Sequence, residues 1–472
     1  MSRKILGPFS RVEGHLEIEL ERSDNTVSLA RVNSPMFRGM ETVMLNRTPM
    51  DALTIAPRIC GICSVSQSVA AARALANLAG AQAPKNGQLV TNLILGTEML
   101  SNHLTHFYMF FMPDFARPIY EDEAWFKDTL RFKAETGDAQ PLALEARSKL
   151  LHIMGLLAGK WPHTLTIRPS GTTQSIKTTE KLKIKSILTG FRRFLEKTVY
   201  GVSLEEILAL SSEADLQNWA ANNLSDLARF ISFSKALDLN HIGTTTSTLL
   251  SGGGSPFATG IFKDGQISSL PVPEIREDIS HSFMTGPTIQ SPHEGLTDPY
   301  LDKEKAYSWC KSPRLDGARC EVGALARHVI NNERLFQDLY SKHTSTVENR
   351  IFARVWEMAY LVKNMESWVD EIDPNGSFYE ETDIPPSGQA IAFVEAARGT
   401  LGHWLTVENG VMTNYQIIAP TTWNFSPRDH IDQAGPLEDA LEGAPIRKDE
   451  EDPVSVQHIV RSFDPCMACT VH

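Results

Sequence analysis

Two pairs of cysteines, one near each end of the sequence, have the spacing of metal ligands. Cys60 and Cys63 form one C-x-x-C motif, and Cys466 and Cys469 form a second. Two intervening residues let both sulfurs of a pair face one ion, so two pairs supply four thiolates. Thiolates favour zinc, iron–sulfur clusters and other thiophilic transition metals over magnesium and calcium. The spacing therefore predicts one metal site shared by both pairs.

Two other interpretations of these cysteines remain open at this point. One is a structural zinc site, although such sites usually close a short loop that has no core of its own. The other is two independent thiol–disulfide motifs, although neither pair follows the strand–helix–strand unit in which such motifs occur. Cys310 and Cys320 stand outside both pairs and are expected to be buried structural thiols.

The segments around the two pairs resemble the signatures of NiFe-hydrogenase large subunits. The first signature has the form R-I-C-G-(V or I)-C, and the second has the form D-P-C-x-x-C-x-x-H. Here they are residues 58–63 and 464–472. The resemblance covers essentially the whole chain, because further matching segments lie at 11–15, 159–163, 321–327 and 397–404.

The resemblance implies a bimetallic centre. Cys60 and Cys466 would be terminal nickel ligands, and Cys63 and Cys469 would bridge nickel to an iron that carries CO and CN ligands. His472 would help to hold Mg2+ or a similar ion together with Glu41, whose carboxylate suits a hard cation. The chain has no spare cysteine set for electron transfer, so a small subunit with iron–sulfur clusters is expected as a partner.

The resemblance also implies how H2 would be split. Cys466 would take the proton, and Glu13 would pass it on as a proton-relay carboxylate. Arg398 would overhang the open metal position as a fixed cation, oriented by Asp464. The plainer alternatives are that Glu13 is an ordinary strand-edge glutamate and that Arg398 and Asp464 form a structural salt bridge.

Five positions depart from the pattern of the catalytic, energy-converting members. They are Gln67, Asn102, Ala397, Ile62 and Phe110, where those members commonly have histidine, aspartate, proline, valine and leucine. The last two add volume along the expected hydrophobic gas channel, and extra volume narrows a channel. We therefore expect hindered access for O2, with plain core variation as the alternative.

The bulky pair and Gln67 look like the regulatory, H2-sensing subgroup, which would add a histidine kinase as a further partner. Sensors are made without the C-terminal extension that catalytic members lose after the last histidine, and the sequence stops at His472. The alternative is an uptake hydrogenase that feeds electrons to a respiratory or redox chain. Two remoter alternatives are a redox-inactive subunit like that at the quinone site of respiratory complex I and a zinc-stabilised scaffold.

The apolar patterns along the chain predict the elements that position these residues. They indicate a helix-rich α+β fold, with a bundle of long helices and small peripheral sheets. We expect a β-hairpin within 13–34, short strands in 251–271, and strands at 388–399 and 403–420. The expected helices are 64–79, 92–111, 143–159, 179–201, 324–370 and 453–462. Residues 1–472 are expected to form one compact domain, consisting of an N-terminal β and C-x-x-C region (1–85), a helical body (86–250), a β-containing middle (251–323), a helix and strand region (324–452) and a C-terminal C-x-x-C segment (453–472).

Composition limits the other classes of function. The chain has 472 residues, a formal net charge of -12 and no evident basic patch, so nucleic acid is not an expected partner. The acidic run 448–452 is expected to be a solvated loop. No run of 18 apolar residues and no apolar leader occurs, so we expect no transmembrane segment and a cytoplasmic protein.

Overall fold

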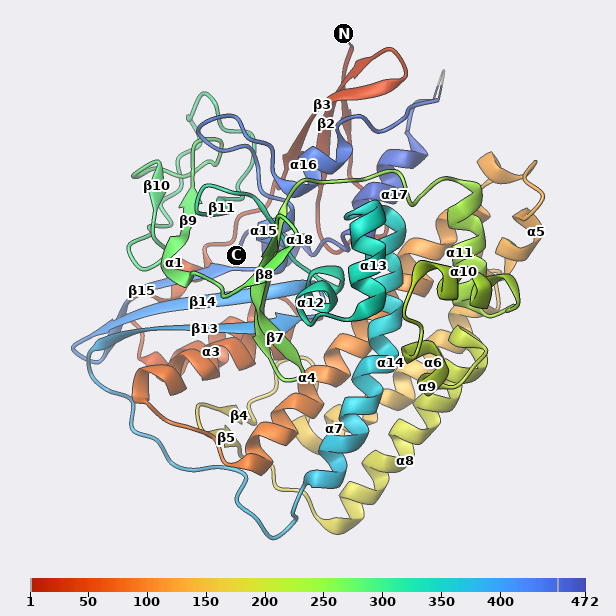
Figure 1. The fold of residues 1–472 in the computed structure, drawn as a ribbon. Helices are drawn as coiled ribbons and strands as arrows, with labels where there is room; N and C mark the ends of the chain where they lie inside the picture. Colours follow the sequence, from red (N-terminus) through yellow and green to blue (C-terminus); the bar gives the residue numbers. More distant parts are fainter. Residues whose placement is uncertain (1, 448–449) are drawn as a thin grey trace.

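A three-stranded antiparallel sheet lies beside the centre of the molecule, with one helix across it. In the computed structural model, which describes residues 2–447 and 450–472, the sheet has the order β13–β14–β15. Helix α3 (Ser64–Ala79) packs against it (Figure 1). Nearly every residue of the middle strand is buried, because both faces of the sheet are covered. The strands are β13 (Gly388–Ala396), β14 (Gly399–Glu408) and β15 (Val411–Ile418).

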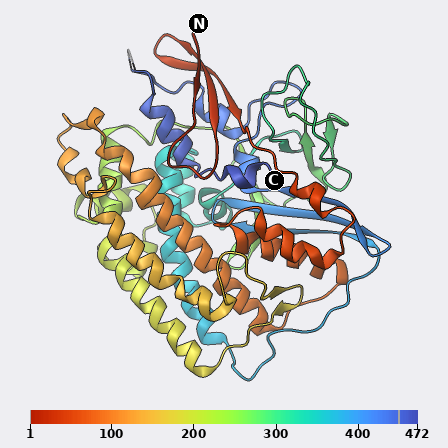
Figure 2. The ribbon, with the colours of Figure 1, turned by 180° about the vertical axis from the view of Figure 1, so that it is seen from behind.

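Long helices form a bundle beside this sheet. Figure 2 shows them running side by side from behind, and α4 contacts α14 along its length. Both of these helices are buried along most of their residues, so their apolar side chains supply much of the core. The bundle consists of α4 (Lys85–Thr105), α6 (Ala139–Leu150), α7 (His152–Ala158), α8 (Thr178–Phe194) and α14 (Val347–Glu371).

Small sheets surround the bundle and the central sheet, which confirms the predicted helix-rich α+β class. The N-terminal sheet contains β1 (Ser2–Leu6), β2 (Glu17–Ser23) and β3 (Thr26–Asn33). A second sheet contains β6 (Thr248–Gly254), β7 (Phe257–Lys263), β8 (Gln266–Ser268) and β12 (Cys320–Glu321), which pairs parallel to β6. The others contain β9 (Ile275–Asp278), β10 (Ile289–Gln290) and β11 (Ser312–Leu315), and β4 (Ile167–Arg168) and β5 (Gly171–Thr172).

The predicted helix 324–370 was wrong as a single element. It consists of α12 (Ala324–Ile330), α13 (Arg334–His343) and α14. Asn332 and Thr344 adopt positive φ angles of 61° and 58°, which interrupt a right-handed helix. The Thr346 side chain then accepts a hydrogen bond from the Asn349 amide and caps α14. The apolar pattern runs across both breaks, so it concealed them.

Other predicted helices differ at their ends. The helix expected at 92–111 begins at Lys85, and its last turn, His106–Phe111, is a π-helix. The helix expected at 143–159 is divided into α6 and α7, whereas that expected at 179–201 also ends in a π-helical turn. The predicted hairpin, α3 and α17 (Val454–Ser462) are confirmed. Short elements that no pattern predicted include α1 (Met40–Met44), α2 (Ala52–Ile55), α9 (Leu204–Leu208), α10 (Glu213–Ala221), α11 (Asp226–Ala236), α15 (Pro420–Asn424), α16 (Pro436–Leu441) and α18 (Met467–Thr470).

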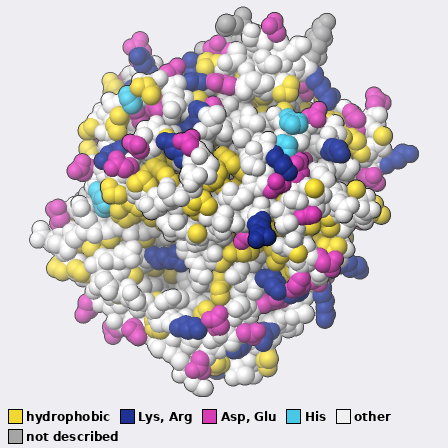
Figure 3. All heavy atoms as spheres, in the orientation of Figure 1, with side chains coloured by type: hydrophobic (Ala, Val, Ile, Leu, Met, Phe, Trp, Pro, Cys, Tyr) yellow, Lys and Arg dark blue, Asp and Glu magenta, His cyan; other side chains and the backbone are white. Residues whose placement is uncertain are grey.

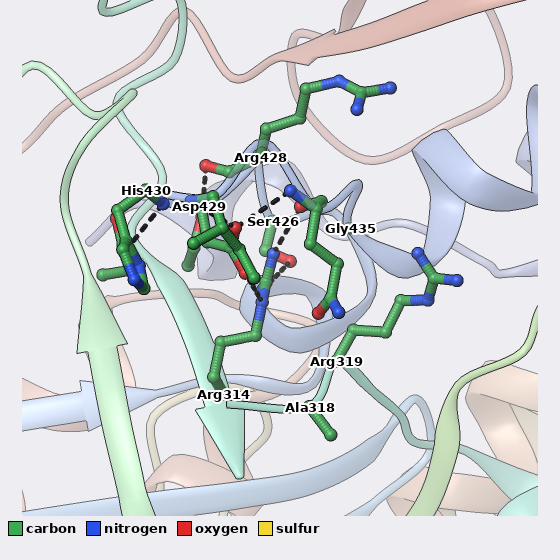
Figure 4. Close-up of polar contacts among 12 residues, drawn as sticks. Arg314, Ala318, Arg319, Ser426, Arg428, Asp429, His430 and Gly435 are labelled. Carbon is green, nitrogen blue, oxygen red and sulfur yellow. Dashed lines mark hydrogen bonds and ion pairs between the residues drawn. The ribbon is translucent and has the colours of Figure 1, made fainter. Parts of the chain in front are cut away.

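A buried arginine fixes the loop between α15 and α16. The Arg314 guanidinium donates to the Asp429 carboxylate over 3.0 Å and to the Ser426 hydroxyl over 3.2 Å (Figure 4). It also donates to the Gln433 carbonyl over 3.0 Å. The pairing balances a charge that would otherwise be costly to bury. The loop therefore has a defined position against β11, close to the C-terminal segment.

The surface carries charges of both signs. Figure 3 shows acidic and basic side chains mixed over one face of the molecule. Among the described residues, no helix is both long and apolar enough to cross a bilayer. Lys448 and Asp449, which begin the acidic run predicted as a loop, lie outside the described residues.

Candidate metal centre

The four cysteines of the two C-x-x-C motifs meet at one buried point. Their sulfurs all lie within 4.8 Å of one another. Cys60 Sγ lies 3.4 Å from Cys466 Sγ, which lies 3.3 Å from Cys469 Sγ. Cys63 directly precedes α3 and Cys466 directly precedes α18, so each pair is positioned by the start of a helix. The structure thus brings together the ligands of the predicted shared site.

The electrostatics of this cluster fit a bound cation. Hydrogen bonding with Cys466 and the other thiols lowers the pKa of Cys60 well below its usual range. Hydrogen bonding with Cys466 and Cys60 raises the pKa values of Cys63 and Cys469 well above theirs. The unliganded cluster therefore favours one thiolate over four, since like charges in a buried space repel. Four thiolates need the charge of metal ions, which the donor set suits.

Arg398 faces this cluster from the turn between β13 and β14. Its Nη1 donates to Cys63 Sγ over 3.4 Å and to Asn102 Oδ1 over 3.1 Å. Its Nη2 donates to Asp464 Oδ1 over 3.1 Å. Burial alone would lower the pKa of Arg398, but Asp464 and Cys63 raise it well above its usual range, so the guanidinium is a fixed cation. Arg398, Asn102 and Asp464 are thus assembled around the sulfurs.

The backbone of Glu13 contacts the segment that carries the second cysteine pair. Its carbonyl accepts a hydrogen bond from the Met467 amide over 2.7 Å, and it forms an isolated bridge with Cys466. The side chain is half-buried. Burial raises the pKa of its carboxyl group, and the nearby Cys60 raises it further. This arrangement differs from that of a strand-edge glutamate, because Glu13 lies outside the named strands.

Glu41 and His472 meet at a second buried point. His472 Nε2 lies 3.3 Å from Glu41 Oε1 and 2.9 Å from the Ile417 carbonyl oxygen, and Nδ1 lies 2.9 Å from the Cys469 carbonyl oxygen. Both ring nitrogens therefore face oxygen acceptors. A neutral imidazole has one N–H, so it needs either a second proton or a cation at Nε2. The carboxylate, carbonyl and imidazole are donors that fit a small divalent ion.

A lysine accompanies this second point. Lys311 Nζ lies 3.6 Å from Glu41 Oε2 and 3.5 Å from Glu277 Oε2. Burial would raise the pKa of Glu41, but Lys311 and His472 outweigh it and lower the pKa to about 2. Two carboxylates face one lysine here, so a further cation could bind without an excess of positive charge. Lys311 and the Ile417 carbonyl belong to no motif, so they could not be predicted from the sequence.

Comparison with known proteins decides which family has this arrangement. The family model described as nickel-dependent hydrogenase matches residues 38–140 and 142–472. The chain belongs to the nickel-dependent hydrogenase family. It is 30% identical to the periplasmic NiFeSe hydrogenase large subunit of Desulfomicrobium baculatum, with 99% of this chain and 94% of that one covered. It is 28% identical to the hydrogenase-2 large chain of Escherichia coli, with 100% and 97% covered.

Solved structures agree with this identification. The reduced NiFeSe hydrogenase of D. vulgaris Hildenborough matches with a TM-score of 0.86 and 28% identity, and the match covers 100% of both chains. The chain is therefore the large subunit of a hydrogenase, an oxidoreductase whose large subunits pair with a small subunit. The family favours a nickel and iron centre over a zinc site at the four sulfurs. These relatives do not distinguish a regulatory role from an uptake role.

The hydrogenase positions Arg398 through a buried ionic cluster. Arg327 on α12 donates to the carbonyls of Ala396 and Ala397, over 2.8 and 3.3 Å, immediately before Arg398. Its other N–H groups donate to Glu357 of α14 over 2.9 and 2.5 Å. Glu395 is a second partner at 2.9 Å. Arg327 belongs to the family-like segment 321–327. This segment thus supports the end of β13, next to Arg398.

Glu98 of α4 holds the first cysteine pair from the other side. Its carboxylate accepts from the amides of Val65 and Ser66, over 2.8 and 2.9 Å, at the N-terminus of α3. It also accepts from the Trp161 indole over 3.1 Å, so the family-like segment 159–163 contacts the same carboxylate. Burial raises the pKa of Glu98 to about 7. A carboxylate at a helix N-terminus is stabilised by the free amides there.

Gln67 and Asn102 occupy defined hydrogen-bonding positions. His403 Nε2 donates to Gln67 Oε1 over 2.9 Å, and His403 Nδ1 accepts from the Tyr415 hydroxyl over 2.8 Å. Burial lowers the pKa of His403 to about 3, which is consistent with a neutral ring. The Asn102 amide donates to the Ile62 carbonyl over 2.9 Å, so it bridges the first cysteine loop to Arg398. His403 was missed, although it lies within the matching segment 397–404.

The predicted gas-channel pair is less closely connected. Ile62 is half-buried against the core, and Phe110 is half-buried in the π-helical turn after α4. Among the described residues, no hydrogen bond or aromatic contact joins the two side chains, so their role in gas access stays a prediction. Cys310 and Cys320 are buried and free, as expected, and burial raises the pKa of Cys310 above its usual range.

Proposed function

We propose that this large subunit activates H2 at a nickel–iron centre held by Cys60, Cys63, Cys466 and Cys469. When bound, the metals supply the electron acceptor for heterolytic cleavage of H2, and the iron carries CO and CN ligands. The convergence of four buried sulfurs within 4.8 Å, with Arg398 directed at Cys63, is the observation that carries the proposal.

The side chains around the centre would handle the proton. Cys466 Sγ would hold it first, and Glu13 is next to Cys466 through a backbone bridge. The Glu13 carboxylate would then accept the proton and release it toward solvent, since a half-buried carboxyl group can exchange protons both with the buried centre and with water. Arg398 would fix the electrostatic field without exchanging protons, and Asp464 would hold its orientation. Electrons would leave through iron–sulfur clusters in the small subunit.

Metal analysis and infrared absorption test the centre. The assembled enzyme should contain nickel and iron and show CO and CN stretching bands, which few other protein sites produce. Cys60→Ser should lose the metals and the bands. Cys310→Ser is the matched control, because it removes a buried thiol outside the cluster and should keep both. Zinc at the four sulfurs in the purified wild-type enzyme would overturn the proposal.

We further propose that the protein is an H2 sensor, placed in the cytoplasm and coupled to a histidine kinase. Ile62, Phe110 and Gln67 support this role. The alternative is an uptake hydrogenase, which the 27% identity to the uptake hydrogenase large subunit of Bradyrhizobium diazoefficiens favours. Sensing predicts slow turnover and a kinase that copurifies with the subunits, whereas uptake predicts fast reduction of an electron acceptor. Cell fractionation tests the location.

The gas-channel part of this proposal has its own experiment. Ile62→Val combined with Phe110→Leu reduces side-chain volume, so the activity should fall faster in air than that of the wild type. Ile187→Val on α8 is the control, because it makes the same change at a half-buried position of the helix bundle. Equal loss of activity in air for all three proteins would refute a narrowed channel.

A further inference from the structure

Arg73, on α3, is a partly buried cation without an acidic partner. Its Nη1 makes a long hydrogen bond of 3.4 Å to the Phe393 carbonyl. In the part of the chain that the structure describes, no carboxylate forms an ion pair with it. Burial lowers the pKa of Arg73, and no acidic group offsets this effect. Removing a charge from water without an acidic partner costs free energy, and a bound anion would offset this cost.

The fold makes room for this guanidinium. Gly254, at the end of β6, has a φ of +111°, and a Cβ there would lie 2.9 Å from Arg73 Nη1. Any larger residue would therefore displace the guanidinium as well as strain the backbone. The glycine-rich segment 252–254 thus allows Arg73 to lie against the chain.

The guanidinium borders a cavity of about 270 Å3. Helices α3 and α4 and strands β4 and β5 supply lining residues, and these elements lie below the central sheet in Figure 1. A second arginine, Arg168 of β4, lines the same cavity and forms no ion pair among the described residues. None of the lining side chains is acidic, although the whole chain has a net charge of -12. The cavity is therefore locally positive.

An amide completes the lining. Asn92 of α4 is 8% exposed, and its side chain has no hydrogen-bond partner among the described residues. The amide is therefore available to a ligand or a water molecule in the cavity. Two guanidinium groups and a free amide supply N–H donors at one place, and guanidinium forks match the oxygens of carboxylates and phosphates.

We propose that this cavity is a binding site for a small oxyanion, either inorganic phosphate or a short carboxylic acid. The volume is slightly below that of pockets that enclose drug-sized ligands, so the ligand is small. The site does not depend on the metal centre, since Arg73 lies more than two helical turns beyond Cys63 on α3. The oxyanion would accept from Arg73, Arg168 and Asn92.

Calorimetric titration of the assembled enzyme with phosphate, and separately with succinate, tests the site and distinguishes the two ligand classes. Ionic strength is held constant with NaCl, because general charge attraction is screened by salt. We expect saturable binding of one ligand per large subunit. Arg73→Gln and Arg168→Gln should each weaken it at least about 10-fold, the effect of losing a hydrogen bond to a charged group. Arg334→Gln removes an exposed arginine at the start of α13 and should leave the affinity unchanged.

Other results of the titration would also support or overturn the proposed oxyanion site. If Arg73→Gln fails to fold, Arg73→Lys keeps the charge without the planar fork and should still weaken binding. Absence of saturable binding of either anion to the wild type would overturn the proposal. Equal affinity in all variants would overturn it too, since binding would then be unrelated to the cavity. If no free anion binds and Arg73→Gln instead weakens subunit association, an acidic group of the small subunit fills the cavity and the proposal fails.

Discussion

Removing the buried charge of Glu357 should destabilise this hydrogenase far more than removing an exposed one. Glu357 accepts two hydrogen bonds from Arg327 and one from His103 over 2.7 Å. Glu357→Gln keeps the shape but leaves Arg327 with Glu395 as its one carboxylate partner. Breaking a buried ion pair typically costs about 3–5 kcal/mol, because the remaining charge is uncompensated. Glu366→Gln, on the same helix α14, is the control, since its pair with Arg192 is partly exposed and worth about 1 kcal/mol or less.

Thermal unfolding of the assembled enzyme measures the difference. The unfolding entropy is about 2.1 cal/mol/K per residue, so a chain of 472 residues loses roughly 1 °C of midpoint per kcal/mol. We therefore expect Glu357→Gln to lower the midpoint by about 3–5 °C and Glu366→Gln by about 1 °C or less. H2 oxidation should also fall in Glu357→Gln, because Arg327 supports the carbonyls next to Arg398. Equal shifts in both variants would refute the reasoning.

Three further changes test other parts of the structure. Asn102→Asp removes the donor to the Ile62 carbonyl, and a loss of about 1–3 kcal/mol is expected in thermal unfolding; an unchanged midpoint would contradict the bridging role. His472→Ala removes a nitrogen donor beside Glu41, so magnesium in elemental analysis should fall while nickel stays; magnesium retained at the wild-type level would speak against the second site. Burial raises the pKa of Glu438 from 4.5 to about 7, so the folded chain holds more protons between these values than the unfolded chain. Stability should therefore fall as pH rises from 4.5 to 7, by at most about 3 kcal/mol, and Glu438→Gln should remove this slope in unfolding midpoints measured against pH.

The ligand set could be predicted from the sequence because its spacing has few meanings. A C-x-x-C pair limits the geometry of its own sulfurs, and two such pairs in one chain suggest a common ion. Glu13 and Arg398 could be selected through the family resemblance alone, since a single glutamate or arginine has no distinctive pattern. Helix α3 could be placed because Gly80 ends it with a positive φ.

The supporting residues could not be predicted, because they act across long distances in sequence. Glu98 and Glu357 lie within apolar helical patterns, where a carboxylate normally marks the exposed face. Their partners come from other elements, so nothing local indicates that they are buried. The same limit applies to Lys311 and to the cavity around Arg73, whose charge balance depends on the folded arrangement.

The sequence separation of the two cysteine pairs imposes an order on assembly in the cell. Cys466 is synthesised 406 residues after Cys60. At about 5–20 residues per second, the ribosome needs roughly 20–80 s to cover that interval. During this time the nascent chain offers two of the four metal-binding thiols, Cys60 and Cys63, without their partners and open to oxidation or to the wrong ion. A chaperone that shields Cys60 and Cys63, or delivers iron to them first, would protect these thiols until the segment containing α18 and the second cysteine pair has been synthesised.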